Sequence, residues 1–178
     1  MPLPNWDEVR AALADAIRAA LPLQVRAAGG GRIAGVGLHF DAYYGSAGLY
    51  LLPEAAAALA MPPEVAANIG DWPISTDRDA TADHAEAFDE HWGTWDDWSR
   101  DHVDALTDAE QEEQWARLPR VACEAMRQVD RDGLLAAFPR TPDFRVIIAE
   151  HDEPDELVVG RYDLFLRTGT IRQFGIDT

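Results

Sequence analysis

The chain has 178 residues, 47% of them hydrophobic, with six tryptophans, one cysteine and a net charge of −17. A chain of this length and composition can bury a sizeable core, which excludes disorder over most of its length, and a single cysteine excludes an intramolecular disulfide. All fifteen basic residues are arginine, which excludes Schiff-base catalysis by lysine and a phosphate-loop lysine. No apolar run approaches the length of a membrane span and no signal-peptide pattern opens the chain, so we expect a cytoplasmic protein.

The acidic residues are concentrated in one segment. Residues 71–113 carry fifteen acids and two arginines, which gives −13 of the total −17, together with four of the six tryptophans. A field of this sign repels nucleic acid and attracts cationic surfaces. We therefore expect a basic protein partner, no nucleic-acid partner and no membrane partner, while no pattern in the sequence assigns an oligomeric state.

The first third of the chain predicts a helix followed by a β-hairpin. Apolar residues recur at three- and four-residue steps from Trp6 to Leu21, and Pro22 lies just beyond the expected end of this helix. From 33 to 41 the apolar period changes to two, and a second apolar run at 49–52 follows a turn. These two runs predict neighbouring strands.

The middle of the chain predicts further helices. Alanine-rich stretches between prolines suggest short helices at 55–60 and 64–69. A capping-box pattern at Thr107 opens a longer helix that runs toward Gly133, in which Pro119 is expected to cause a kink or a division. One stripe along this helix consists of Gln111, Trp115, Leu118, Ala122, Met126 and Val129.

The last part of the chain predicts strands. Residues 144–149 have the pattern of a central strand, and 157–159 are its expected partner across an acidic turn. The ending at 162–174 is ambiguous. There is no internal repeat and no linker, so we expect one α+β domain over residues 1–178, with a small antiparallel or mixed sheet packed against several helices.

The densest aromatic feature lies at Phe88–Trp98. Phe88, Trp92 and Trp95 recur at four- and three-residue steps, which is typical of a helix seam packed on the core. The alternative is that Trp95 or Trp98 stays exposed and acts as an aromatic anchor inside an acidic rim. The binding surface predicted from this second interpretation consists of Asp89, Glu90, Trp92, Trp95, Asp96, Asp97 and Trp98.

Histidines and carboxylates offer an enzymatic alternative. The candidate groups are His84 and His91 with Asp89 or Glu90, or His39 and Asp41 at the end of a strand. On a continuous helix, His84 and His91 would share one face two turns apart, but no His-Glu-x-x-His spacing occurs. In one interpretation the histidines at 84, 91 and 102 are ordinary surface residues. In the other, His84 and His91 with nearby carboxylates, or His39 and Asp41, form the site of a metal-assisted hydrolase. Since these spacings are weak, we expect no catalytic residue, no metal and no cofactor, and we keep the hydrolase as the alternative.

Cys123 allows two interpretations. It lies on the predicted helix near Arg120 and Arg127, whose charges could lower the pKa of its thiol and make it reactive. A lone cysteine on a helix is otherwise a small core residue.

Three stretches of the sequence resemble a known family. They are His39–Leu51, Gly70–Pro73 and Phe88–Trp98, and together they resemble the bacterial family called domain of unknown function 4303. The resemblance implies a cytoplasmic bacterial α+β domain without an established activity, of a kind that also occurs among candidate immunity proteins for secreted toxins. It brings no catalytic residue. The leading hypothesis is therefore a non-catalytic protein-binding module, such as an immunity protein for a basic toxin.

Overall fold

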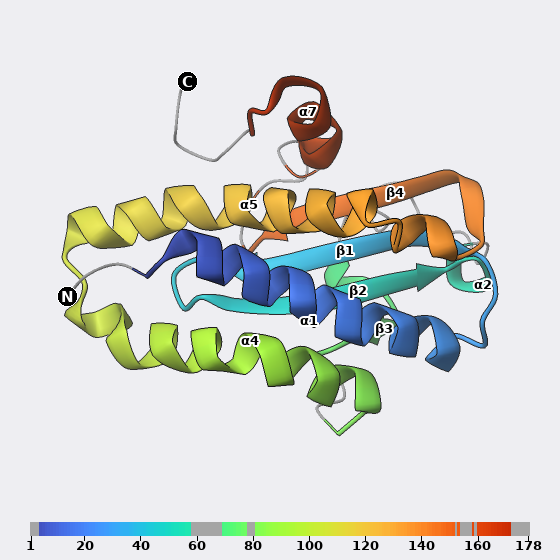
Figure 1. The fold of residues 1–178 in the computed structure, drawn as a ribbon, viewed down its shortest axis with the longest axis horizontal. Coiled ribbons are helices and arrows are strands. Elements are labelled where there is room, and N and C mark those ends of the chain that lie inside the picture. The colour runs from blue at the N-terminus through green and yellow to red at the C-terminus, as the bar shows by residue number, and fades with distance from the viewer. Residues whose placement is uncertain are drawn as a thin grey trace.

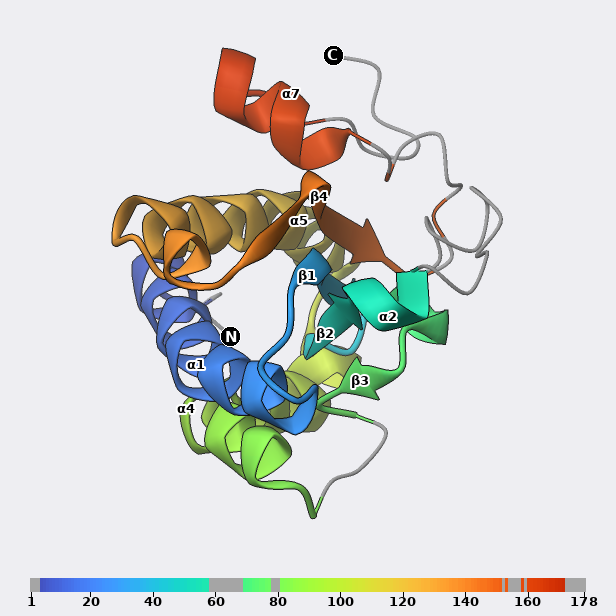
Figure 2. The ribbon, with the colours of Figure 1, turned by 90° about the vertical axis from the view of Figure 1, so that its right-hand side faces the viewer.

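The computed structural model describes residues 4–57, 69–77, 81–151, 153, 158 and 160–171. These residues form a four-stranded mixed sheet packed against helices, which confirms the predicted α+β class. Three long helices lie side by side over one face of the sheet (Figure 1). In the view turned by 90°, the short helix α2 (Glu54–Ala57) lies on the opposite side of the sheet (Figure 2).

The strand order of the sheet is β3-β2-β1-β4. The strands are β1 (Ile33–Asp41), β2 (Ser46–Pro53), β3 (Ile74–Ser75) and β4 (Arg140–Glu150). β1 and β2 form the predicted antiparallel hairpin, in which Leu38 pairs with Leu49. β4 is parallel to β1 and is an edge strand within the described part of the sheet, so its prediction as a central strand is wrong.

The chain beyond β4 differs from the predicted hairpin. Of the strand predicted at 157–159, the structure describes only Val158, which is buried and helical. The ambiguous C-terminal pattern forms α7 (Arg161–Thr168). The buried guanidinium of Arg161 lies 2.5 Å from the carboxylate of Glu153, and this ion pair holds α7 against the end of β4 where a strand partner was expected.

The long helices form one layer with α1 in its middle. They are α1 (Trp6–Ala27), α4 (Asp83–His102) and α5 (Asp108–Arg131), and the short turns are η1 (Ile69–Asp71), η2 (Val103–Ala105) and η3 (Leu135–Ala137). The predicted capping box of α5 is present, because the Thr107 hydroxyl accepts from the Glu110 N–H and the Glu110 carboxylate accepts from the Thr107 N–H. Of the two predicted short helices, α2 confirms the start of the first. Residues 58–68, which carry the rest, lie outside the described residues.

Two prolines lie inside helices. α1 continues through Pro22 to Ala27, and α5 is not divided at Pro119, so the predicted helix end and division are wrong. A proline removes one backbone hydrogen bond from a helix, but packing on both sides of it can outweigh this loss. Beyond Pro22, for example, the side-chain amide of buried Gln24 donates to the Leu49 carbonyl at 2.8 Å and fixes the last turns of α1 to the sheet.

Each face of the sheet carries its own hydrophobic cluster. Side chains from the three long helices pack on the face of β1 that presents Leu38. On the other face, Trp72 and Ile69 lie over β1, where Gly35 and Gly37 leave room for them. A Cβ atom at Gly35 would lie 2.7 Å from the Trp72 ring. The alternation of large and small residues in β1 therefore reflects two buried faces.

Candidate docking surface at the acidic end

The β1–β2 turn, the end of β4 and the connection from α4 to α5 meet at one end of the molecule, on the left in Figure 1. We call the surface formed by residues 41–45, residues 96–115 and Glu150 the acidic end, because residues 96–115 contribute eight acids and one arginine. Its exposed carboxylates include Asp97, Asp101, Asp104, Asp108, Glu112 and Glu113. Much of the negative charge of residues 71–113 therefore lies at this end of the molecule.

The β1–β2 turn presents two tyrosines to solvent. The Asp41 carboxylate accepts hydrogen bonds from the backbone N–H groups of Tyr43 and Tyr44, at 3.0 and 3.2 Å, as is usual where aspartate begins a turn. The two phenol rings contact each other edge to face, with 4.8 Å between centroids. Tyr43 is 45% exposed and Tyr44 is 54% exposed. The turn therefore holds two large aromatic side chains outside the core.

Both long helices of the acidic end fix this turn in place. Gly45 has a φ of +71° and lies so close to α4 that a Cβ atom would overlap the Ser99 side chain. From α5, the buried amide of Gln114 donates to the Ala42 carbonyl at 2.9 Å and also lies within hydrogen-bond distance of Ser99. The position of Tyr43 and Tyr44 is thus determined by the packing of the turn on α4 and α5.

Trp115 and Glu150 adjoin the same turn. The indole N–H of Trp115 donates to Glu150 Oε1 at 3.3 Å, while 56% of the side chain stays exposed. The Glu150 carboxylate also accepts from the backbone N–H of Ala42. The pKa of Glu150 is raised to about 7, mainly by burial and in part by the charges of Glu153 and Asp41, while the hydrogen bonds from Trp115 and Ala42 lower it. An exposed indole and a carboxyl that titrates near neutrality therefore lie in contact.

The predicted binding tryptophans of α4 are mainly core residues. Trp92 is buried, and Trp95 is only 7% exposed because its ring packs against those of Trp6, Trp92 and Trp98. The helix seam is thus confirmed, and the expectation that Trp95 could be an exposed anchor is wrong. Trp98 is partly buried and stacks on His102.

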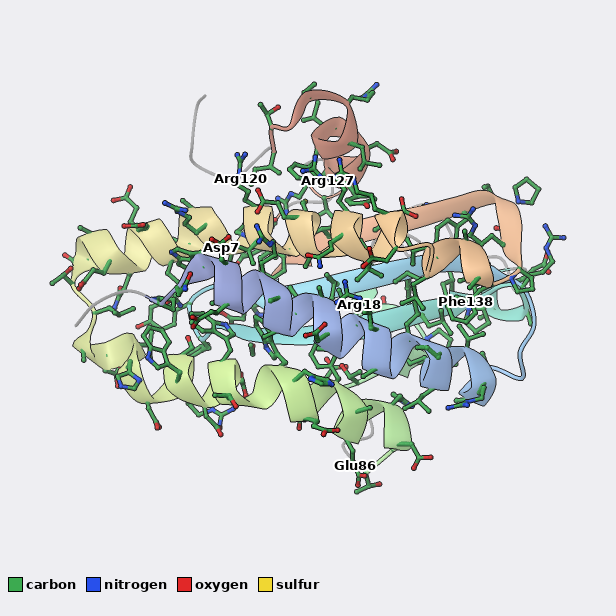
Figure 3. All side chains as sticks on the ribbon, viewed as in Figure 1. Asp7, Arg18, Glu86, Arg120, Arg127 and Phe138 are labelled. Atoms are coloured by element: carbon green, nitrogen blue, oxygen red, sulfur yellow. The ribbon has the colours of Figure 1, made fainter. Side chains whose placement is uncertain are left out.

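The predicted binding acids lie on the other side of α4. Asp89, Glu90 and Asp97 are exposed. They follow Glu86 at three-, four- and eleven-residue steps and so share its side of the helix. Glu86 points away from α1 in Figure 3. Asp96 is partly buried beside Arg100, and burial raises the pKa of its carboxyl. The acids therefore form a solvent-facing surface, while the tryptophans between them face inward.

The proposed histidine ligands of α4 do not come together. His84 is buried with Nε2 3.0 Å from the Ser75 carbonyl, whereas His91 is exposed. His102 Nδ1 lies 2.5 Å from the Trp98 carbonyl. Within the described ranges, no group of three or more His, Cys, Asp or Glu side chains is arranged to hold a metal ion. These histidines are part of the helix packing and its surface.

The other histidine candidate lies at the end of β1. The ring of His39 contacts that of His151, with 5.7 Å between centroids, and that of buried Tyr50. Burial, and then the charge of His151, lowers the pKa of His39. The hydroxyl of Tyr50 donates to Asp77, and Asp41 is engaged by the backbone of the turn. The two histidines therefore face each other on the side of the sheet that lies away from the long helices.

Cys123 is a core residue. Its side chain is fully buried, and burial raises the pKa of the thiol to about 12. The attraction of Arg161 and Arg120 for the thiolate is smaller than this effect. The alternative of a reactive thiol with a lowered pKa is wrong, because desolvation outweighs the nearby positive charge.

Sequence reasoning missed the exposed aromatic residues and Glu150. Trp115 shares the spacing of Leu118, Ala122, Met126 and Val129, which are buried, but near the start of α5 Gln114 is buried and Trp115 is exposed, so the buried side is shifted only there. No local signal shows this shift. Two consecutive tyrosines in a turn that ends in Gly45 are a visible signal for Tyr43 and Tyr44, because turn residues are seldom covered by other elements.

Comparisons with known proteins identify no relative. No family model matches the chain, and neither curated proteins nor solved structures contain a match. The resemblance to domain of unknown function 4303 therefore stays a prediction. None of the helices in the described part of the chain is long and apolar enough to cross a membrane.

Proposed function

We propose that this protein is a non-catalytic, cytoplasmic binding module that holds a basic protein partner against the acidic end, as an immunity protein would hold a basic toxin. One observation carries the proposal. Of the large hydrophobic side chains that the structure describes as exposed, Tyr43, Tyr44 and Trp115 lie at the acidic end, and only Leu166 lies elsewhere, on α7. Tryptophan and tyrosine are the residue types that most often anchor protein interfaces.

The charge around these rings supports a basic partner. A row of exposed acids runs from α4 through η2 into the first turns of α5, and its one arginine, Arg100, is already paired with Asp96 and Asp97. Acids at the rim of an interface steer a cationic partner into encounter, and the aromatic groups then slow its dissociation. The same surface repels nucleic acid, whose phosphates carry the same charge.

The test compares immobilised proteins as baits in an extract of the source organism. The wild type, Leu166→Ala and the double variant Tyr44→Ala/Trp115→Ala are used in parallel, and each is first shown to be folded by circular dichroism. We expect the wild type and Leu166→Ala to retain the same basic protein, which the double variant loses and which moderate salt elutes. If every bait retains the same proteins, or if the retained protein is acidic, the acidic end is not the docking surface.

A second candidate function, metal-assisted hydrolysis, is favoured by one observation. His39 and His151 lie at the ends of neighbouring parallel strands, with their rings in contact. Two imidazoles could bind a zinc ion and leave its other positions to water or substrate, since the described part of the chain offers no third His, Cys, Asp or Glu ligand there. This candidate predicts that zinc raises the melting temperature of the wild type but not of His39→Ala, with His91→Ala as the exposed control. If zinc has no effect on the wild type, this candidate is excluded.

A further inference from the structure

Glu150 is a buried carboxylate at the end of β4 that lacks a cationic partner within the described part of the chain. It is 9% exposed and accepts hydrogen bonds from the N–H groups of Trp115 and Ala42. The nearby guanidinium of Arg161 pairs with Glu153 and donates to the Ile148 carbonyl. A buried carboxylate is unfavourable unless a cation compensates it. The fold thus places a negative group where its own described arginines do not neutralise it.

The indole of Trp115 lies directly beside this carboxylate. Its N–H points to Glu150, and more than half of the side chain is exposed to solvent. The face of an indole ring attracts cations, and the planar guanidinium of arginine can stack on such a face while its N–H groups donate to a carboxylate. An ammonium group of lysine offers no plane for stacking. The pair of Trp115 and Glu150 therefore suits an arginine side chain better than a lysine side chain.

We propose that Trp115 and Glu150 form a receptor site for an arginine side chain of the partner, which stacks on the indole ring and donates to the Glu150 carboxylate. This inference rests on the proposed function and names the chemistry that the acidic end recognises. Tyr43 and Tyr44 lie on the adjoining turn, and Asp41 begins that turn and adds negative charge. The partner thus has an exposed arginine at the centre of its docking surface.

Recognition at this site depends on pH near neutrality. An arginine binds the ionised form of Glu150, whose pKa burial raises to about 7. If only the ionised form binds, the dissociation constant falls about tenfold between pH 6 and pH 8, because the competent fraction rises from about one tenth to about nine tenths. The groups that face Glu150 are Asp41 from β1, Trp115 from α5 and Glu153, which is neutralised by Arg161 from α7. His151 follows Glu150 in the chain and is a second titratable neighbour.

The experiment uses a capped oligoarginine peptide as the probe and nuclear magnetic resonance as the readout. The indole N–H signal of Trp115 is assigned with Trp115→Phe and followed during peptide titrations at pH 6 and pH 8. Glu150→Gln removes the proposed receptor carboxylate. Glu112→Gln, which changes an exposed acid on the helix that carries Trp115, is the matched control for the loss of one negative charge. An oligolysine peptide of equal length tests the preference for guanidinium.

We expect the wild type and Glu112→Gln to bind oligoarginine about tenfold more tightly at pH 8 than at pH 6, with a shift of the Trp115 signal. Glu150→Gln should bind more weakly at pH 8 and lose most of the pH dependence, and oligolysine should bind more weakly than oligoarginine. If Glu150→Gln behaves like Glu112→Gln while the Trp115 signal still shifts, the receptor site is refuted but the acidic end remains a docking surface. If oligoarginine shifts no signal at the acidic end of the wild type, both proposals fail.

Discussion

The aromatic seam of α4 and the exposed aromatic residues at the acidic end contain the same kinds of side chain in opposite environments. Trp92 and Trp95 lie within the helix layer, where Trp92 is 1% exposed. Trp115 and the two tyrosines of the turn lie within acidic surroundings but keep about half of their surface in contact with water. Burial of an aromatic side chain stabilises the fold, whereas an exposed one contributes little to stability. The seam therefore maintains the fold, and the exposed set is available to a partner.

The largest expected effect separates these two roles. Trp92→Ala should lower the free energy of unfolding by about 3–5 kcal/mol, because it leaves a large cavity in the core. Trp115→Ala, which removes a side chain that is 56% exposed and one hydrogen bond to Glu150, should lower it by less, about 1–2 kcal/mol. Urea denaturation followed by circular dichroism measures both. Equal losses of stability in the two variants would show that Trp115 is part of the core.

A smaller effect tests how the exposed set is positioned. Gly45→Ala should lower the free energy of unfolding by about 1–3 kcal/mol, because alanine is strained at positive φ and its Cβ would overlap Ser99. Gly133→Ala is the control, since Gly133 also has a positive φ but nothing lies within 4 Å of its added Cβ. If both variants lose the same amount, contact with α4 does not fix the turn that presents Tyr43 and Tyr44.

The ionisation of Glu150 should change the free energy of unfolding by an amount on the order of 1 kcal/mol between low and neutral pH. Its pKa is near 7 in the folded protein and 4.5 ordinarily, so the folded state binds more protons between these pH values. The contribution of Glu150 to stability therefore falls as pH rises from about 4.5 to about 7. The free energy of unfolding of Glu150→Gln, relative to that of the wild type, should therefore be higher at pH 8 than at pH 4. Urea denaturation curves at both pH values measure this change, and a constant difference would contradict the buried, ionisable Glu150.

The smallest effect on stability concerns the acidic rim. Asp97→Asn with Asp101→Asn should change the free energy of unfolding by less than about 0.5 kcal/mol, because both side chains are exposed. The pair should nevertheless slow association with a basic partner, and added salt should abolish the difference. Stopped-flow kinetics measures the rate. Asp143→Asn, an exposed substitution at the start of β4, should leave association unchanged; equal slowing in that variant would indicate a general charge effect.

The sequence predicted the parts of the fold that depend on local periodicity. The opening helix, the β1–β2 hairpin, the capping box at Thr107 and the seam of α4 all follow from residue spacing. The helix end at Pro22 and the division at Pro119 were misjudged because tertiary packing can maintain a helix that lacks one hydrogen bond. The sequence around a proline shows that a helix hydrogen bond is lost there, but it does not show the tertiary contacts that compensate this loss.

The candidate site was less predictable than the fold. The excess of acidic residues was visible in the sequence, and three of the acids predicted to lie on the surface, Asp89, Glu90 and Asp97, are exposed. The contact between Trp115 and Glu150 joins residues 35 positions apart, and it depends on how α5 lies beside β4. No spacing rule predicts such a contact. The raised pKa of Glu150 has the same origin, since burial by distant elements is its main cause.

Site-specific photocrosslinking tests the central claim most directly. A benzophenone amino acid is placed at Glu112, which is exposed on α5 one turn before Trp115, or, as the control, at Leu166, the exposed hydrophobic residue of α7. Both proteins are irradiated in an extract of the source organism at low and at high salt, and crosslinked proteins are identified by mass spectrometry. We expect that position 112 crosslinks a basic protein, that high salt suppresses this product and that position 166 does not form it. Crosslinking of the same protein from position 166 with equal yield, or of an acidic protein from position 112, would contradict the proposed docking surface.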